Sequence, residues 1–74
     1  MNELIYEPVR RMLEEKRPGW SYVFEDKMLK INTNDNFVDP EIIQEIRSLG
    51  FRIDEIGYLK QFGIIFSIVE ESLV

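Results

Sequence analysis

Two helix-like segments, each followed by two strand-like segments, constrain the fold of this chain more than any other feature of its sequence. Apolar residues in the helix-like segments recur about every 3.6 residues, as on one face of a helix. One such segment ends before Pro18 and the other covers 40–49, whereas the strand-like runs cover 20–24, 28–32, 51–58 and 62–70. This order predicts an α+β fold, a two-layer sandwich with a four-stranded, mainly antiparallel sheet and two helices on one face, in the order αββαββ.

The second helix has both a start signal and a stop signal. The carboxylate of Asp39 can accept hydrogen bonds from the free amides of the first turn, and Pro40 follows at a position where a missing N–H costs nothing. Gly50 supplies a residue suited to the left-handed conformation that ends many helices. The stripe expected to face the sheet consists of Ile42, Ile43, Ile46 and Leu49.

The start of the first helix is less certain from the sequence, because Pro8 lies within its apolar pattern. Either the helix begins near Glu7 with Pro8 in its first turn, or an earlier start is kinked at Pro8. In both cases the expected apolar positions are Ile5, Val9, Met12 and Leu13.

Alternation along the strands assigns their side chains to two faces of the sheet. The residues expected to face the helices are Trp20, Tyr22, Phe24, Leu29, Ile31, Phe51, Ile53, Ile64, Phe66 and Ile68. The residues expected on the opposite face are Ser21, Val23, Met28, Lys30, Arg52, Asp54, Ile65, Ser67 and Val69.

The last strand, FGIIFSIVE, is apolar on both faces, although a half-covered antiparallel strand should alternate between apolar and polar residues. In one interpretation the strand is central and its outer aliphatic side chains are ordinary exposed residues. In the other, which we favour, a second copy of the chain covers them. The predicted homodimer interface is Val23, Met28, Ile65 and Val69. The last residues, 70–74, could extend the strand, form a short helix or fray.

The length and composition favour this second interpretation. The 74 residues form one small domain, 1–74, which buries only about 60% of its unfolded surface, so its stability should be marginal without reinforcement. The chain contains no cysteine and no histidine, which excludes disulfides and leaves oligomerisation as the available reinforcement. The absence of alanine and the many charged residues would fit a heat-adapted source or an AT-rich genome.

No arrangement of residues indicates catalysis or cofactor binding. Without histidine or cysteine, the usual bases and nucleophiles are missing, so we expect a non-enzymatic protein with no catalytic residues. The segment NTNDNFVDPE resembles a calcium loop in its alternating Asn residues, but Phe37 and Ile43 occupy the positions that require Gly and a bidentate Glu. We therefore expect no metal and no cofactor, and interpret the segment as a polar loop.

A local basic cluster on the first helix supports one alternative function. Arg10, Arg11, Lys16 and Arg17 could contact a protein partner or nucleic acid, and aromatic residues on a strand, such as Trp20, can stack on bases. The net charge of −5 argues against backbone binding to nucleic acid, so we rank this alternative lower without excluding it.

The leading hypothesis is therefore a small acidic, cytoplasmic protein–protein interaction module that acts as a homodimer and binds another, unidentified protein. A nucleic-acid-binding protein and a small-ligand sensor with a pocket at the dimer seam are the alternatives. No apolar run approaches the roughly 20 residues that span a bilayer, and we expect no membrane association.

Overall fold

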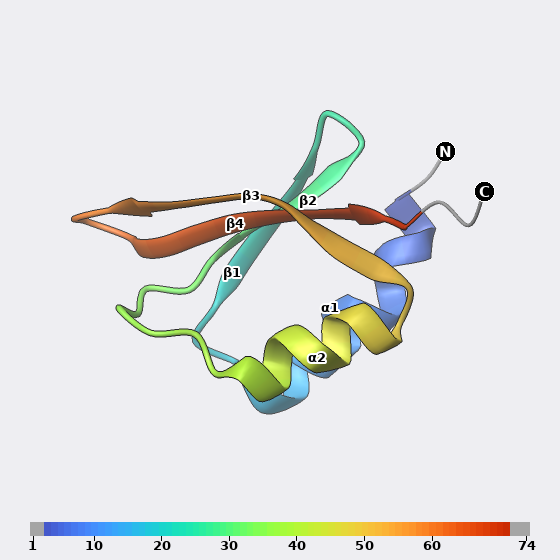
Figure 1. Ribbon diagram of the computed structural model, residues 1–74, viewed down its shortest axis with the longest axis horizontal. Helices are drawn as coiled ribbons and strands as arrows, with labels where there is room; N and C mark the ends of the chain where they lie inside the picture. The colour runs from blue at the N-terminus through green and yellow to red at the C-terminus, as the bar shows by residue number, and fades with distance from the viewer. Residues whose placement is uncertain (1–2, 72–74) are drawn as a thin grey trace.

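Two helices cover one face of a four-stranded antiparallel sheet, which confirms the predicted α+β two-layer sandwich (Figure 1). The computed structural model describes residues 3–71. Its elements are a short 3₁₀ helix, η1 (Glu3–Tyr6), followed by α1 (Glu7–Lys16), β1 (Ser21–Glu25), β2 (Met28–Asn32), α2 (Pro40–Ser48), β3 (Phe51–Leu59) and β4 (Gly63–Glu70). The continuation at residues 72–74, left open by the sequence, lies outside the described residues.

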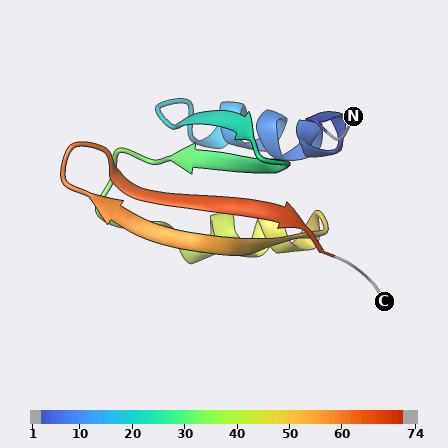
Figure 2. The same ribbon diagram turned by 90° about the horizontal axis from the view of Figure 1, so that it is seen from above.

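The strand order is β1-β2-β4-β3, so the strand with two apolar faces is central and β1 and β3 form the edges. Figure 2 shows the resulting arrangement, in which α1 lies beside the β1–β2 hairpin and α2 lies beside the β3–β4 hairpin. Phe66 and Ile68 of β4 are buried beneath the helices, whereas Ile65 and Val69 point to the face that no helix covers. We call this uncovered side the open face.

The core lies between the helices and the sheet, and the predicted division of the strand residues is confirmed on this side. Six of the ten residues expected to face the helices are buried, and the other four are partly buried against the core; the buried six are Trp20, Leu29, Ile31, Phe51, Phe66 and Ile68. Val9, Met12 and Leu13 of α1 and Ile42 and Ile46 of α2 complete this layer.

The first helix begins at Glu7 with Pro8 in its first turn, which confirms the first of the two alternatives. The 3₁₀ helix η1 precedes it and places Tyr6, which the sequence did not indicate, in the core. The Tyr6 ring stacks on Phe51 at a centroid distance of 5.0 Å, and its single hydroxyl proton is shared between the carbonyls of Lys27 and Ile68, at O···O distances of 3.0 and 3.3 Å. One side chain thus joins the chain's N-terminal segment to both hairpins.

The second helix follows both its predicted start signal and its predicted stop signal, but it is one residue shorter than predicted. The Asp39 carboxylate accepts from the Glu41 amide at 2.9 Å, as expected of an N-cap. Leu49, expected on the buried stripe, is exposed instead. The helix ends at Ser48 and Gly50 adopts φ +99°, so the chain turns away before Leu49 can face the sheet.

A β-bulge in β3 determines which side chains its distal half presents. The register with β4 shifts between Ile53 and Glu55, which leaves Asp54 as the extra residue. After the shift, Ile56 and Tyr58 pair with Phe66 and Ile64 and therefore lie on the side of the helices, whereas Glu55, Gly57 and Leu59 lie on the open face. A regular strand would have placed these two groups the other way round.

Candidate functional site

The distal end of the β3–β4 hairpin exposes the largest group of apolar side chains in the described part of the chain. We define the distal hairpin as residues 55–64; it projects beyond the end of α2 (Figure 1). The exposed fractions are 67% for Ile56, 57% for Tyr58, 51% for Leu59 and 43% for Phe62. No helix covers the distal hairpin; the loop at residues 33–35 contacts only its β4 side.

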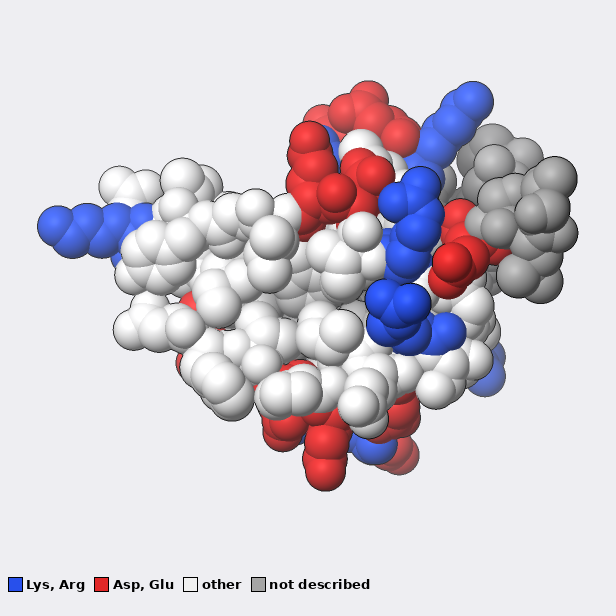
Figure 3. Space-filling model, viewed as in Figure 1, with Lys and Arg blue, Asp and Glu red and all other residues white. Residues whose placement is uncertain are grey.

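The surface around the distal hairpin also carries few charges. Figure 3 looks onto the β3 edge and shows a broad area without Lys, Arg, Asp or Glu across the hairpin and the loop below it, apart from a basic side chain that projects at the left end. Phe37, from the loop between β2 and α2, adds another exposed aromatic side chain. The Tyr58 hydroxyl donates to the Asn36 side chain of that loop at 3.1 Å, which ties the two segments together. Contiguous apolar surface of this kind often marks an interaction site.

Polar side chains interrupt the group of four residues predicted as the dimer interface. Val23 is 56% exposed, but the register places Lys30 beside it and Ser67 beside Lys30, between Val23 and the aliphatic residues of β4. The other three residues, Met28, Ile65 and Val69, are partly buried. The Lys30 ammonium is held on this face by Glu25 and Asp26, at 3.2 and 3.6 Å.

Sequence reasoning missed the distal hairpin for a specific reason. The exposure of Ile56 and Tyr58 depends on the bulge at Asp54 and on the start of α2 at Pro40, which leaves the hairpin uncovered, and neither follows from apolar periodicity. The one available signal was FRIDEIGYL itself, in which two adjacent acids interrupt the alternation of a strand.

A shallow groove of about 600 Å³ lies on the open face beside β3. Its lining includes the charged Lys30 and Glu55, the apolar Leu59 and Ile65, and Ser67 between them. Ser67 is only 5% exposed, and its hydroxyl has no hydrogen-bond partner. A buried hydroxyl without a partner loses its hydration without compensation.

We therefore expect Ser67→Ala to leave the free energy of unfolding unchanged or to raise it by up to about 1 kcal/mol, since it removes an unsatisfied group. Thr33→Val is the matched comparison, because the buried Thr33 hydroxyl bonds to the Ile64 carbonyl at 3.0 Å and accepts from the Asp35 amide at 3.1 Å. Loss of the Thr33 hydroxyl should lower the free energy of unfolding by about 1–3 kcal/mol. Urea unfolding measures both, and a clear destabilisation by Ser67→Ala would show that its hydroxyl does have a partner.

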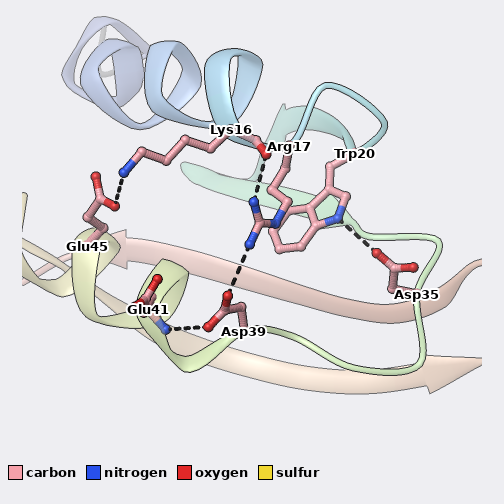
Figure 4. Close-up of polar contacts among 7 residues, drawn as sticks. All are labelled: Lys16, Arg17, Trp20, Asp35, Asp39, Glu41 and Glu45. Atoms are coloured by element: carbon pink, nitrogen blue, oxygen red, sulfur yellow. Dashed lines mark hydrogen bonds and ion pairs between the residues drawn. The ribbon is translucent and has the colours of Figure 1, made fainter.

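The predicted basic cluster on α1 is divided between two places, and each of its cations has a carboxylate nearby. Arg10 and Arg11 contact Glu7 at 2.8 and 3.8 Å, and the Arg10 guanidinium also lies over the Tyr22 ring. Figure 4 shows the other two cations: Lys16 pairs with Glu45 and Arg17 pairs with Asp39, and these two ion pairs connect α1 to α2. This pairing weakens the positive field that a polyanion would meet.

Where the structure shifts the pKa of an ionisable group, it moves that pKa further from neutral pH. A hydrogen bond to Glu14 raises the pKa of Tyr22, and carboxylate partners raise the pKa values of Lys16 and Lys30. The pKa of Tyr6 is raised by burial and by the negative charge of Glu70. These groups therefore keep their usual charge near pH 7, and none of the four is tuned for acid–base catalysis there.

The loop NTNDNFVDPE serves as a structural connection. The Trp20 indole donates to Asp35 at 3.3 Å (Figure 4), and the Asn34 side chain donates to the Gly19 carbonyl. Across residues 3–71, no group of three or more Asp or Glu side chains is placed to hold a metal ion.

No helix within the described residues is both long and apolar enough to cross a membrane. A comparison of the chain with protein-family models, curated proteins and solved structures finds no match.

Proposed function

We propose that this chain is a small, non-enzymatic protein–protein interaction module that acts as a homodimer and presents its remaining surface to another protein. The observation that carries the proposal is the distal hairpin, which leaves Ile56, Tyr58, Leu59 and Phe62 exposed beside an unpaired strand edge. A chain of 74 residues has a small core, so covering these side chains would add a large share to its total apolar burial.

The charge distribution supports self-association at this site. The net charge of −5 makes two copies repel each other in general. The distal hairpin is where that repulsion is weakest, because the area around it carries few charged residues (Figure 3). Two copies can therefore approach there more easily than through the acidic parts of the surface.

Light scattering across micromolar concentrations tests the proposal. We expect a mass that rises with concentration from 8.9 kDa toward twice that value. A mass of 8.9 kDa at every concentration would contradict the homodimer, and the exposed residues would then have to be covered by a different protein.

The groove on the open face favours a small-ligand sensor as a second candidate, because the charged Lys30 and Glu55 line it and the unpartnered Ser67 hydroxyl is buried just beneath them. A thermal-shift panel of amino acids, carboxylic acids and nucleotides tests it. A compound that raises the melting temperature of the native chain but not of Ser67→Val would support this function. A panel without any shift would count against it.

The nucleic-acid alternative has less support, because each of Arg10, Arg11, Lys16 and Arg17 has a carboxylate within 4 Å. A salt-dependent gel shift that disappears when Arg10 and Arg11 are both changed to glutamate would restore it.

A further inference from the structure

The outer edge of β3 exposes the backbone groups of Ile56 and Tyr58. The Ile64 amide donates to the Asp35 carbonyl at 2.8 Å, and the Ile64 carbonyl accepts from the Thr33 amide at 3.0 Å. Both groups of Ile64 therefore point away from β3, so its partner Tyr58 cannot form ladder hydrogen bonds with it. The N–H and C=O of Tyr58 point outward, and by alternation those of Ile56 do too.

We propose that two copies of the chain pair antiparallel along this edge, β3 against β3, with a two-fold axis at Gly57. This inference rests on the proposed homodimer and names its interface. The two sheets would join into one continuous sheet with four strands from each copy, and the helices of both copies would lie on the same side. Such strand addition at a free edge is a common way for proteins to associate.

Two conditions determine the register. Residues directly opposite each other in an antiparallel pair share a face, and the outward backbone groups of one copy must meet those of the other. A register centred on Gly57 meets both conditions, because it places Ile56 of each copy opposite Tyr58 of the other. These two pairs exchange four backbone hydrogen bonds and bring together an aliphatic and an aromatic side chain that are exposed in the single chain.

Neighbouring registers match less well. Centring the pair on Tyr58 would place Ile56 opposite Lys60, and centring it on Ile56 would place Tyr58 opposite Asp54, the extra residue of the bulge. The register centred on Gly57 instead brings two residues without side chains together at the axis, where a narrow antiparallel pair has its closest approach. A Cβ placed on Gly57 meets nothing within 4 Å, so the single chain itself does not need glycine there.

Charge complementarity supports the same orientation. The paired stretch begins after the acidic residues Asp54 and Glu55 and ends before Lys60. Antiparallel pairing places the Lys60 of each copy near the acidic end of the other. The bulge and the ion pair between Arg52 and Asp54, at 3.6 Å, disfavour strand pairing along the first half of β3. The pairing is therefore confined to the distal half.

Cross-linking tests the axis directly, because the chain contains no cysteine of its own. At the axis, the two Gly57 Cα atoms would lie about 4.5 Å apart, as in a non-hydrogen-bonded antiparallel pair. That separation lies within the range of a disulfide, about 4.4–6.8 Å. We expect Gly57→Cys to form a disulfide-linked dimer under mild oxidation. Val23→Cys, an exposed position on the other edge strand, is the matched control and should form little disulfide-linked dimer.

Charge substitution tests the interface without any cross-link. Ile56→Lys places two ammonium groups in the contact and should raise the dimer dissociation constant by about 100-fold. Val23→Lys introduces the same charge at a similarly exposed position and should change it by less than about threefold. Circular dichroism should show native secondary structure for both variants, since both side chains are exposed in the single chain.

The outcomes separate this inference from the proposed function. A native chain that is monomeric throughout contradicts both. A native dimer that Val23→Lys dissociates and Ile56→Lys does not would keep the function and overturn the edge pairing in favour of the open face. A native dimer in which Gly57→Cys does not cross-link faster than Val23→Cys would overturn the register.

Discussion

Gly63→Ala is expected to lower the free energy of unfolding by about 3–4 kcal/mol, which is most of the roughly 3–5 kcal/mol that the core of such a small domain supplies. Gly63 begins β4 with φ +73°, a conformation that costs an alanine roughly 1–2 kcal/mol. An added Cβ would also lie 2.5 Å from the backbone nitrogen and oxygen of Asp35. The obstacle is backbone, so no side-chain rotation can relieve it.

The reason for this close approach is the way residues 33–35 continue the sheet. The amides of Thr33 and Asn34 donate to the carbonyls of Ile64 and Phe62, so the loop lies against the start of β4. Gly19→Ala is the control, because its added Cβ meets nothing within 4 Å and its φ is not positive. Chemical denaturation should find Gly19→Ala close to the native chain. A Gly63→Ala variant as stable as this control would show that the loop does not contact β4 so closely.

Tyr6→Ala is expected to be similarly damaging, with a loss of about 3–5 kcal/mol from the cavity that it leaves. The Tyr6 ring is buried and lies 5.0 Å from the Phe51 ring and 5.6 Å from the Phe24 ring, measured between centroids. Its removal would open the core between η1 and both hairpins. If Tyr6→Ala remained stably folded in urea titrations, η1 would not be an integral part of the fold.

Tyr6→Phe separates the contribution of the hydroxyl from that of the ring. It should cost about 1 kcal/mol, because the carbonyls of Lys27 and Ile68 lose a donor. It should also change the dependence on pH. Burial raises the pKa of Tyr6, so above about pH 10 the unfolded chain releases this proton before the folded chain does. The stability is complete below that pH and falls above it, and the fall should be shallower in Tyr6→Phe.

Much of the fold could be predicted from the sequence because local signals and the apolar pattern agree. Asp39 and Pro40 begin a helix and Gly50 ends it, and these signals are local because they do not depend on contacts with distant segments. The strand residues expected to face the helices do so because side chains alternate strictly along β1, β2 and β4.

The features that the sequence did not reveal depend on contacts between distant segments. Tyr6 lies before the helical pattern and is buried only because both hairpins provide acceptors and aromatic neighbours for it. The bulge at Asp54 reverses the faces of the following residues, which strict alternation cannot anticipate. Gly63 has a steric role that becomes visible only when residues 33–35 are placed beside β4.

The candidate interface was likewise predicted only in part from the sequence. The observation that β4 is apolar on both faces correctly indicated a strand with uncovered side chains, and it led to Val23, Met28, Ile65 and Val69 as predicted contacts. The more exposed group, Ile56 and Tyr58, lies on β3, and its exposure depends on where α2 begins. The test of Ile56→Lys against Val23→Lys decides between the two surfaces.

The most direct test of the β3 interface is amide hydrogen exchange at single-residue resolution, measured as the protein concentration is raised. We expect the Ile56 and Tyr58 amides to exchange rapidly in dilute solution and to become protected as dimers form. The Gly57 amide, which by alternation faces β4, should be protected throughout. If Ile56 and Tyr58 exchange at the same rapid rate at concentrations where the mass is that of a dimer, the two copies do not pair along β3.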